Sequence, residues 1–403
     1  MLTHANISSA HITPPTDIRT KPSANPKDTT MTRTTMTGTT MTRTTMTRTG
    51  FLLSRVLLRF DHSSDAEDLV GELSAAAISP DGSLWVGADE LLSVERLSPV
   101  GHNIFGEHTT FALKNYLDLF NDEDEIDIEG MAYDSGYLWV TGSHSSKRKK
   151  PKGKTTSEDL ERLARVAFDD NRYLLGRIPE HGGALLASYQ DTQGDQLTAA
   201  SLQKTERGNV LIDALREDRH LGPFIDFPIP SKDNGFDIEG MAVKEGRVFL
   251  GFRGPVLRGY AVIVEIEPEL SDTGVLTLKD IGDDAPYRKH FVKLDGFGVR
   301  ELCFHGDDLL ILAGPTLDHD GAQRLFRLHD ALDLDENSVA DDDNDGLEYL
   351  FDLPFVAGAD KAEGLEIYPV LDDPNAVLIL HDAPHPDRRR GQYELFADVY
   401  RLP

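Results

Sequence analysis

One six-residue segment of this sequence returns letter for letter and indicates a repeated fold. Residues 127–132 read DIEGMA, residues 237–242 read the same, and residues 362–365 give a shorter third copy, AEGL. The β-rich runs that follow these copies are residues 137–142, 247–251 and 376–381. Such an order is typical of a strand, a turn and a second strand. Two weaker copies, at residues 73–87 and 299–312, bring the number of similar hairpins to five.

The spacing of the copies predicts a β-propeller. The residues at one equivalent position of the five hairpins are Ser74, Glu129, Glu239, Arg300 and Glu363. The steps between them are 55, 110, 61 and 63 residues. Steps of about 60 residues suit four-stranded blades with long loops, and the step of 110 then contains two blades. We therefore expect an all-β fold with six blades, the sixth hidden between residues 162 and 227. Five blades and an open β-solenoid are the alternatives.

The two ends of the folded part are predicted to pair. A strand at residues 56–60 would complete the blade that ends at residues 395–400 and leave no free sheet edge. Residues 51–403 then form one propeller domain. Residues 1–50 contain repeated Met- and Thr-rich pentads with almost nothing apolar to bury, which predicts a disordered tail. The alternative is that this tail does not belong to the native protein.

Composition limits the partners that we expect. The formal net charge is −28, so nucleic acid is not an expected partner. The basic run at residues 147–154 is either a solvated loop or a docking site for a phosphate-rich ligand. No stretch has the unbroken apolar core of a signal peptide or membrane span, and Cys303 is the single cysteine, which suits a reducing, cytoplasmic location.

Two sets of polar residues are predicted to meet at one mouth of the central channel. In a propeller, the loop that leads into each inner strand lies on the same face as the loop that follows the second strand. The residues that precede or begin the inner strands are Asp127, Glu129, Asp237, Glu239, Arg300, Glu301 and Glu363. The residues that follow the second strands are Asp89, Glu90, Ser143, His144, Arg253, Thr316, His381 and Asp382.

Carboxylates gathered at a narrow mouth repel one another unless they are protonated, paired or bound to a metal. The predicted metal ligands are Asp127, Glu129, Asp237, Glu239 and Glu363. An all-oxygen set suits calcium better than zinc, which prefers cysteine and histidine. Arg300 is instead a possible counter-ion between two carboxylates. The architectural alternative is that glutamate accepts backbone N–H groups of the next blade, while the glycine after it permits close approach.

A second calcium site is predicted near the C-terminal end. Asp341, Asp343 and Asp345, with Gly346 at the sixth place and Asp352 at the twelfth, match the spacing of a calcium loop in which Asp replaces the usual final Glu. An acidic hairpin tip without metal is the alternative interpretation.

The sequence also resembles an uncharacterised bacterial family, domain of unknown function 3616, over residues 55–400. The segments that carry this resemblance are both DIEGMA copies and residues 142–145, 230–235 and 252–257. It implies a propeller and brings no established reaction. A more distant similarity, through the Glu-Gly pair before an inner strand, connects the chain with phytase-like esterase propellers and gluconolactonase-type lactonases. In those propellers a glutamate at such a position binds the metal.

Two functions from different classes follow. In the first, a calcium-dependent hydrolase acts on a phosphoester or lactone, with Arg253 and Arg300 stabilising negative charge and His144 or His381 transferring a proton. In the second, the same mouth binds a small anionic molecule or a partner protein without turnover. The sequence has no Gly-x-Ser-x-Gly elbow, phosphate-binding Walker loop or dinucleotide fingerprint, which disfavours other common enzyme classes.

Overall fold

The structure is a computed structural model that describes residues 48–61, 66–227, 229–282, 285–341, 344, 346–369 and 373–403. These residues belong to one compact unit that begins at Thr47, close to the predicted boundary after residue 50. The predicted disorder of the tail falls almost wholly on residues outside the described ones. None of the helices in the described part of the chain has the length and apolar content needed to cross a membrane.

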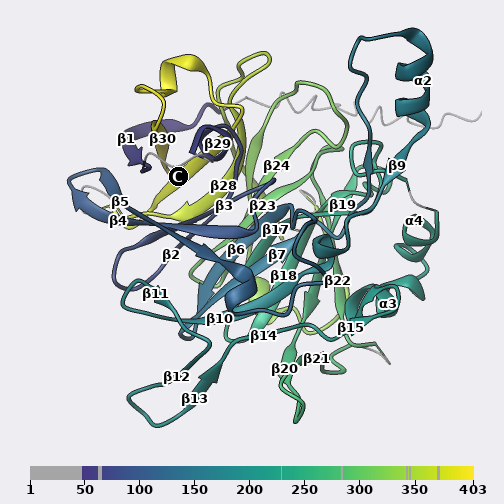
Figure 1. Cartoon of the computed structure of the whole chain (residues 1–403), viewed down its shortest axis with the longest axis horizontal. Helices are drawn as coiled ribbons and strands as arrows, with labels where there is room; N and C mark the ends of the chain where they lie inside the picture. Colours follow the sequence, from purple (N-terminus) through teal and green to yellow (C-terminus); the bar gives the residue numbers. More distant parts are fainter. Residues whose placement is uncertain are drawn as a thin grey trace, which may run out of the picture. The chain divides into compact units, whose positions relative to one another are not determined.

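Five mostly antiparallel sheets build this unit, if the two halves of one continuous eight-stranded sheet are counted separately, and each begins with one of the predicted hairpins (Figure 1). The first holds β2 (Leu73–Ile78), β3 (Leu84–Ala88), β4 (Ser93–Gly101) and β5 (Ile104–Ala112). The second holds β6 (Ile128–Asp134), β7 (Tyr137–Gly142) and β10 (Leu175–His181), with β11 (Ala184–Leu185) and β14 (Ala200–Ser201) beside β10. The third holds β17 (Asp237–Lys244), β18 (Arg247–Gly254), β19 (Tyr260–Ile266), β22 (Arg288–Lys293) and β26 (Ser338–Ala340).

The last two sheets complete the series. The fourth holds β23 (Gly298–His305), β24 (Asp308–Gly314), β25 (Arg324–Leu328) and β27 (Leu347–Asp352). The fifth holds β28 (Lys361–Ile367), β29 (Ala376–Asp382), β30 (Glu394–Arg401) and β1 (Phe51–Arg59). Short 3-10 turns lie between strands, at η1 (Leu113–Asn115), η2 (Asp170–Tyr173), η3 (Ala331–Asp333) and η4 (Pro386–Arg388). The helix α1 (Ala66–Gly71) precedes β2.

The five inner strands form a closed ring. β2 contacts β6, β6 contacts β17, β17 contacts β23, β23 contacts β28, and β28 contacts β2. Five apolar clusters fill the five gaps between neighbouring sheets, so burial of apolar surface holds the ring together. This arrangement is a β-propeller, which confirms the predicted all-β fold class. The expected sixth blade is not confirmed.

The segment between β7 and β17, which includes the stretch predicted as a sixth blade, forms no separate four-stranded sheet in its described part. Apart from β10, β11 and β14 of the second sheet, it is an insertion that contains α2 (Thr156–Ala164), α3 (Val210–Arg216), α4 (Gly222–Asp226) and short ribbons. The ribbon strands are β8 (Lys147–Arg148) with β9 (Val166–Ala167), β12 (Ser188–Gln190) with β13 (Gln196–Thr198), and β15 (Lys204–Thr205) with β16 (Gly208–Asn209). Strands of two or three residues cannot form a blade. The longer strand of this stretch, β10, pairs with β7 of the second sheet. A further ribbon, β20 (Pro268–Leu270) with β21 (Leu276–Leu278), extends from the third sheet.

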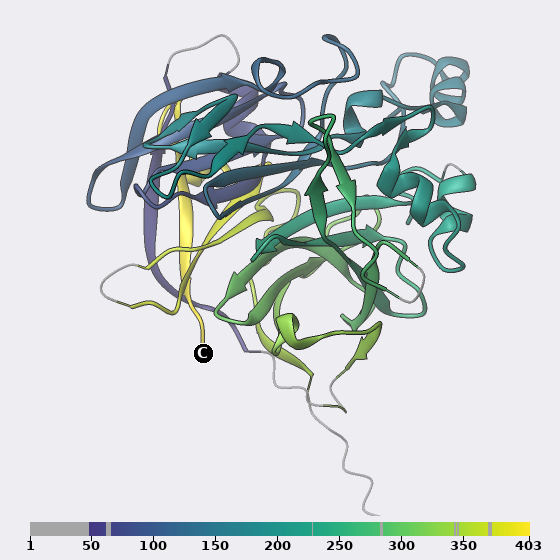
Figure 2. The same ribbon diagram turned by 90° about the horizontal axis from the view of Figure 1, so that it is seen from below.

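The predicted closure is confirmed. β1 pairs antiparallel with β30 over most of its length, and it also pairs in parallel with β5. Figure 2 shows β1 beside the C-terminal strand. The N-terminal strand therefore links the last sheet to the first, and Leu58 near its end is completely buried.

Each inner strand contains a β-bulge at the equivalent position of the repeat. The strand register shifts around Ser74, Glu129, Glu239, Arg300 and Glu363. A bulge leaves one residue out of the ladder and re-aims its side chain. The motif is therefore the sequence signature of a bulge at the channel mouth.

The glycines that follow two of these bulges are required by close packing. A Cβ atom on Gly130 would lie 2.8 Å from the backbone nitrogen of Met241 in the next inner strand. A Cβ atom on Gly240 would lie 2.8 Å from the Cα atom of Glu301. Neighbouring inner strands thus approach too closely for any side chain, as the architectural interpretation of the Glu-Gly pair predicts.

Candidate functional site

Members of both predicted sets of polar residues line one cavity at the mouth of the channel. The cavity has a volume of about 690 Å³. Its lining includes inner-strand residues and second-strand residues, namely Asp89, Asp127, Glu129, Asp237, Glu239, Arg253, Glu363 and Asp382. This volume lies within the usual range for sites that bind small molecules.

Ion pairs neutralise one side of the mouth. Arg253 contacts Asp237 and Glu239, with both N–O distances 2.5 Å. Arg300 contacts the other oxygen of Glu239 at 2.8 Å and also pairs with Glu363. Two arginines thus alternate with three carboxylates, and Arg300 has the position that the counter-ion interpretation requires. The two glutamates have no need of a metal ion to balance their charge.

The opposite side of the mouth has an excess of carboxylates. Asp89, Asp127 and Glu129 each offer an oxygen atom, and these atoms lie within 4.8 Å of one another. Asp127 also pairs with Arg172, with an N–O distance of 2.6 Å. The Oδ1 atom of Asp89 is buried and has no hydrogen-bond partner among the described residues. Glu129 is only 9% exposed, and its carboxylate makes no hydrogen bond or ion pair within the described ranges.

Burial and mutual repulsion raise the pKa values of these three groups. Burial, and then the nearby Asp127 carboxylate, raise the pKa of Asp89 well above its ordinary value. Burial, and then Glu239 and Asp89, do the same to the pKa of Glu129. Burial also raises the pKa of Asp127, although Arg172 opposes the shift. Protonation or a shared cation would relieve the repulsion among the three groups.

Local backbone structure positions this cluster. Glu129 is the bulged residue of β6, and Asp127 just before it has a φ of 57°, a conformation that aspartate tolerates better than most residues. Such strain often accompanies functional sites. Arg172 approaches from η2 in the insertion and also pairs with Glu125. Sequence reasoning missed Arg172 and Glu125, because neither belongs to a repeated segment.

The donor atoms of the cluster suit a hard divalent cation. Calcium binds oxygen ligands at roughly 2.3–2.6 Å, so two ligands of one ion lie at most about 5 Å apart. The 4.8 Å limit of this cluster falls within that span. Of the five predicted ligands at the mouth, Asp127 and Glu129 lie in the cluster, whereas Asp237, Glu239 and Glu363 pair with arginine. Asp89 is the third member of the cluster. The sequence predicts this residue at the mouth but not as a metal ligand.

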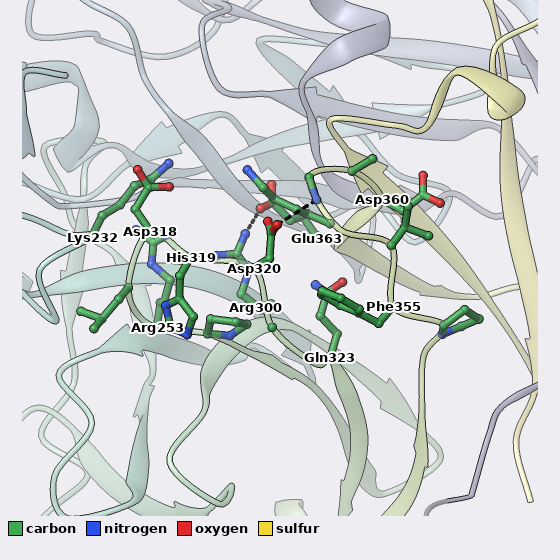
Figure 3. Close-up of a pocket in the computed structure, with 18 residues that line it drawn as sticks. Lys232, Arg253, Arg300, Asp318, His319, Asp320, Gln323, Phe355, Asp360 and Glu363 are labelled. Carbon is green, nitrogen blue, oxygen red and sulfur yellow. Dashed lines mark hydrogen bonds and ion pairs between the residues drawn. The ribbon is translucent and has the colours of Figure 1, made fainter. Parts of the chain in front are cut away.

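A second cavity adjoins the first. It has a volume of about 400 Å³, and the residues that it shares with the larger cavity are Lys232, Arg253, Asp318, Lys361 and Glu363. In Figure 3, Arg300 points to Glu363, and Phe355 and Lys232 lie on opposite sides of the pocket. Phe355 is 57% exposed, so its ring is an open apolar surface beside charged groups.

The two histidines predicted to transfer protons lie outside both cavities. His144 is buried, where its Nδ1 atom lies 2.9 Å from the carbonyl oxygen of Gly142 and its Nε2 atom 2.9 Å from the amide nitrogen of Asn209. Burial lowers the pKa of His144 to about 4. Burial, and then Arg388, lower the pKa of His381 to about 4 as well. Of the four predicted catalytic residues, the structure brings Arg253 and Arg300 to the mouth.

The predicted calcium loop is only partly described. Asp343 and Asp345 lie outside the described residues. Positions seven to twelve of the loop form the extended strand β27, so the chain does not curl around one ion there. Asp352 at the twelfth position pairs with Arg324, with an N–O distance of 2.9 Å, while Asp341 accepts a long hydrogen bond of 3.4 Å from Tyr260. A metal at this second place stays a prediction.

Comparison with known proteins gives a family and several distant structural likenesses. A family model described as "Protein of unknown function (DUF3616)" matches residues 72–398. No curated protein matches the chain. Similar solved structures include virginiamycin B lyase from Staphylococcus aureus, with 10% identity, coverage of 86% of this chain and 99% of that one, and a TM-score of 0.34.

Two further structures give similar values. The calcium-binding protein regucalcin from Agrobacterium tumefaciens has 10% identity, coverage of 89% and 97%, and a TM-score of 0.36. The PQQ-bound aldose sugar dehydrogenase from Streptomyces coelicolor has 10% identity, coverage of 86% and 98%, and a TM-score of 0.31. Likenesses this weak carry no argument about activity, and the propeller assignment rests on the strand pairing of this chain.

Proposed function

The chain belongs to the DUF3616 family of proteins of unknown function, and from the geometry of its own site we propose that it is a calcium-dependent hydrolase. The observation that carries this proposal is the cluster of Asp89, Asp127 and Glu129 at the channel mouth. The buried carboxylates of Asp127 and Glu129, together with the partly buried Asp89 and its unpartnered oxygen, supply the negative charge and the ligand atoms that a divalent cation needs.

The proposed substrates are a phosphoester or a lactone. A calcium ion at the cluster would act as a Lewis acid on a phosphoryl or carbonyl oxygen. In either ester, a water oxygen bonds to the phosphorus or carbonyl carbon, the ester bond breaks, and the leaving oxygen takes up a proton. Lys232 is the best placed residue to stabilise negative charge, because it lines both cavities and has no ion pair among the described residues. Arg253 and Arg300, by contrast, each already pair with two carboxylates.

A non-catalytic site for a small anion or a partner protein is the second candidate function. The observation that favours it is the position of His144 and His381, which leaves the two cavities without the proton-transfer histidines that the sequence predicts. A mouth that holds a cation and several lysines can bind an anion without chemistry.

The test is a hydrolysis screen with matched variants. Wild-type protein, Glu129→Gln and the distant surface variant Glu336→Gln are assayed against phosphomonoesters, phosphodiesters and lactones, with calcium and with a chelator. The proposal predicts turnover that needs calcium, is lost in Glu129→Gln and is retained in Glu336→Gln. Turnover that survives both the chelator and Glu129→Gln would contradict the metal role, and absence of turnover despite calcium binding would favour the second candidate.

A further inference from the structure

The larger cavity collects basic residues in a protein that is otherwise acidic. Residues 51–403 contain 35 of the 41 Lys and Arg residues, which is about one residue in ten. The cavity lining has nine among its 25 residues. They are Lys147, Arg148, Lys149, Lys150, Arg162, Arg172, Lys232, Arg253 and Lys361. Twelve acidic residues line it too, so the cavity is built almost entirely from charged groups.

Five of these basic residues come from one element, the hairpin of β8, α2 and β9 (Figure 1). The base of the hairpin is anchored to the propeller. Lys147 pairs with Glu125 in the loop before β6, and Arg148 contacts Asp233 in the loop before β17 at 2.8 Å. These ion pairs hold the base of the hairpin beside the mouth, so Lys149 and Lys150 line the cavity.

Three lysines at the cavity form no ion pair with the part of the chain that the structure describes. The ammonium groups of Lys149, Lys150 and Lys232 make no hydrogen bond or ion pair with any described residue. Lys232 comes from the loop before β17 and is exposed, so it faces the mouth from an element other than the hairpin. If residues 147–154 were only a solvated loop, there would be no reason for a lysine from a separate loop to line the same cavity.

We infer that the site takes a small phosphorylated molecule, with its phosphate near these three lysines and the remainder in the adjoining cavity. This inference rests on the proposed function for the cation site and names its substrate class. A phosphate dianion offers several acceptor oxygens and two charges, which suit ammonium groups and a divalent cation together. An uncharged lactone would leave Lys149 and Lys150 without a role.

The adjoining cavity indicates the nature of the remainder. The two cavities share Lys232 and Lys361, so one molecule can extend from one into the other. Phe355 and Leu317 line the smaller cavity and are 57% and 49% exposed. A flat apolar group attached to the phosphate would cover these side chains and remove their surface from water. The combined size suits a small molecule rather than a macromolecule.

Calorimetry with phenyl phosphate tests this inference. The full chain is titrated with phenyl phosphate and with the neutral analogue benzyl alcohol, with and without calcium. The matched variants are the double change Lys149→Gln and Lys150→Gln at the cavity and the double change Lys152→Gln and Lys154→Gln, which removes two charges from the same hairpin away from the mouth. We expect phenyl phosphate to bind, benzyl alcohol not to bind, and affinity to fall about tenfold in the first variant but less than twofold in the second.

The outcomes separate this inference from the proposed function. Phenyl phosphate binding that depends on Lys149 and Lys150 but not on calcium would support the inference while the calcium proposal fails. Calcium binding without phenyl phosphate binding would overturn the inference alone. Equal losses in the two double variants would also overturn it, because the effect would then report general charge. Binding of phosphatidic acid vesicles without phenyl phosphate would overturn it as well, because the lysines would then serve a membrane surface.

Discussion

Glu129, Glu239 and Glu363 fill the same position of the repeat, yet their surroundings give them different chemistry. Glu239 lies between two arginines and Glu363 pairs with one, whereas Glu129 faces Asp89 and Asp127. The repeat predicts all three glutamates at the mouth because a bulge recurs in each inner strand. The repeat does not predict which glutamate lacks an arginine partner, because Arg253 lies in a second strand, outside the repeated position.

The raised pKa values make calcium affinity depend on pH. The carboxyl groups of Asp89 and Glu129 hold protons above their ordinary pKa values, and calcium must displace these protons. We expect calcium affinity to be weaker at pH 6 than at pH 8, with protons released on binding. Calorimetry in two buffers of different protonation enthalpy measures both effects. Equal affinity at the two pH values would show that these carboxylates are not the ligands.

His144 is expected to contribute to stability rather than to chemistry. Its pKa is about 4 in the folded protein, below the ordinary value of 6.5, so between these values the unfolded chain binds a proton that the folded chain does not. The free energy of unfolding therefore falls as pH falls, by roughly 2 kcal/mol from this residue between pH 7 and pH 5.

The variant His144→Asn isolates that contribution, since asparagine tolerates the positive φ of 54° at this position. Urea denaturation measures the free energy of unfolding of both proteins. The value for the wild type minus the value for the variant should be about 2 kcal/mol smaller at pH 5 than at pH 7. A difference that stays constant over this range would mean that His144 is not held neutral.

At the scale of elements, the sequence predicts the hairpins well and the insertion poorly. Each of the five predicted hairpins is present because alternating apolar residues and tight turns specify strands locally. The expected sixth blade would begin near residue 162, but residues 162–164 end α2 and Val166–Ala167 form the short strand β9. No repeated motif marks the insertion. Its short strands pair within two-stranded ribbons, and the local pattern of apolar residues cannot distinguish such ribbons from a blade.

The close approach of inner strands gives a prediction about glycine. The change Gly240→Ala places a Cβ atom 2.8 Å from the Cα atom of Glu301, and a strand backbone cannot move aside as a flexible side chain can. We expect the free energy of unfolding to fall by about 2–3 kcal/mol, the usual cost of overpacking a well-packed core.

Gly101→Ala is the matched control, because a Cβ atom there meets nothing closer than 3.7 Å. Denaturant unfolding of both variants measures the effect. Similar stabilities for the two variants would contradict the argument that inner strands need glycine after the bulge.

At the scale of the whole molecule, closure by β1 should determine whether the ring is stable. β1 pairs with β30 and with β5, and its central apolar residues are buried. A chain that starts at residue 61 loses these pairs and exposes the edges of two sheets. We expect it to melt at least 10 °C below a chain that starts at Thr47 or to aggregate, because the loss of several buried apolar residues exceeds a typical stability margin.

Differential scanning calorimetry on the two truncated chains measures this effect. Removal of residues 1–46 alone should leave the melting temperature of the full chain unchanged. Equal melting temperatures for the chains that start at residues 47 and 61 would show that closure does not depend on β1.

The central claim concerns the cation site, and calcium titration of the metal-stripped protein tests it most directly. Isothermal titration calorimetry at pH 8 should give one equivalent that disappears in Glu129→Gln and remains in Glu336→Gln, because only the first change removes a ligand of the Asp89, Asp127 and Glu129 cluster. Any equivalent that persists in Glu129→Gln would report another site, such as the loop at residues 341–352. Equal calcium binding by all three proteins, or none in the wild type at millimolar calcium, would contradict the account.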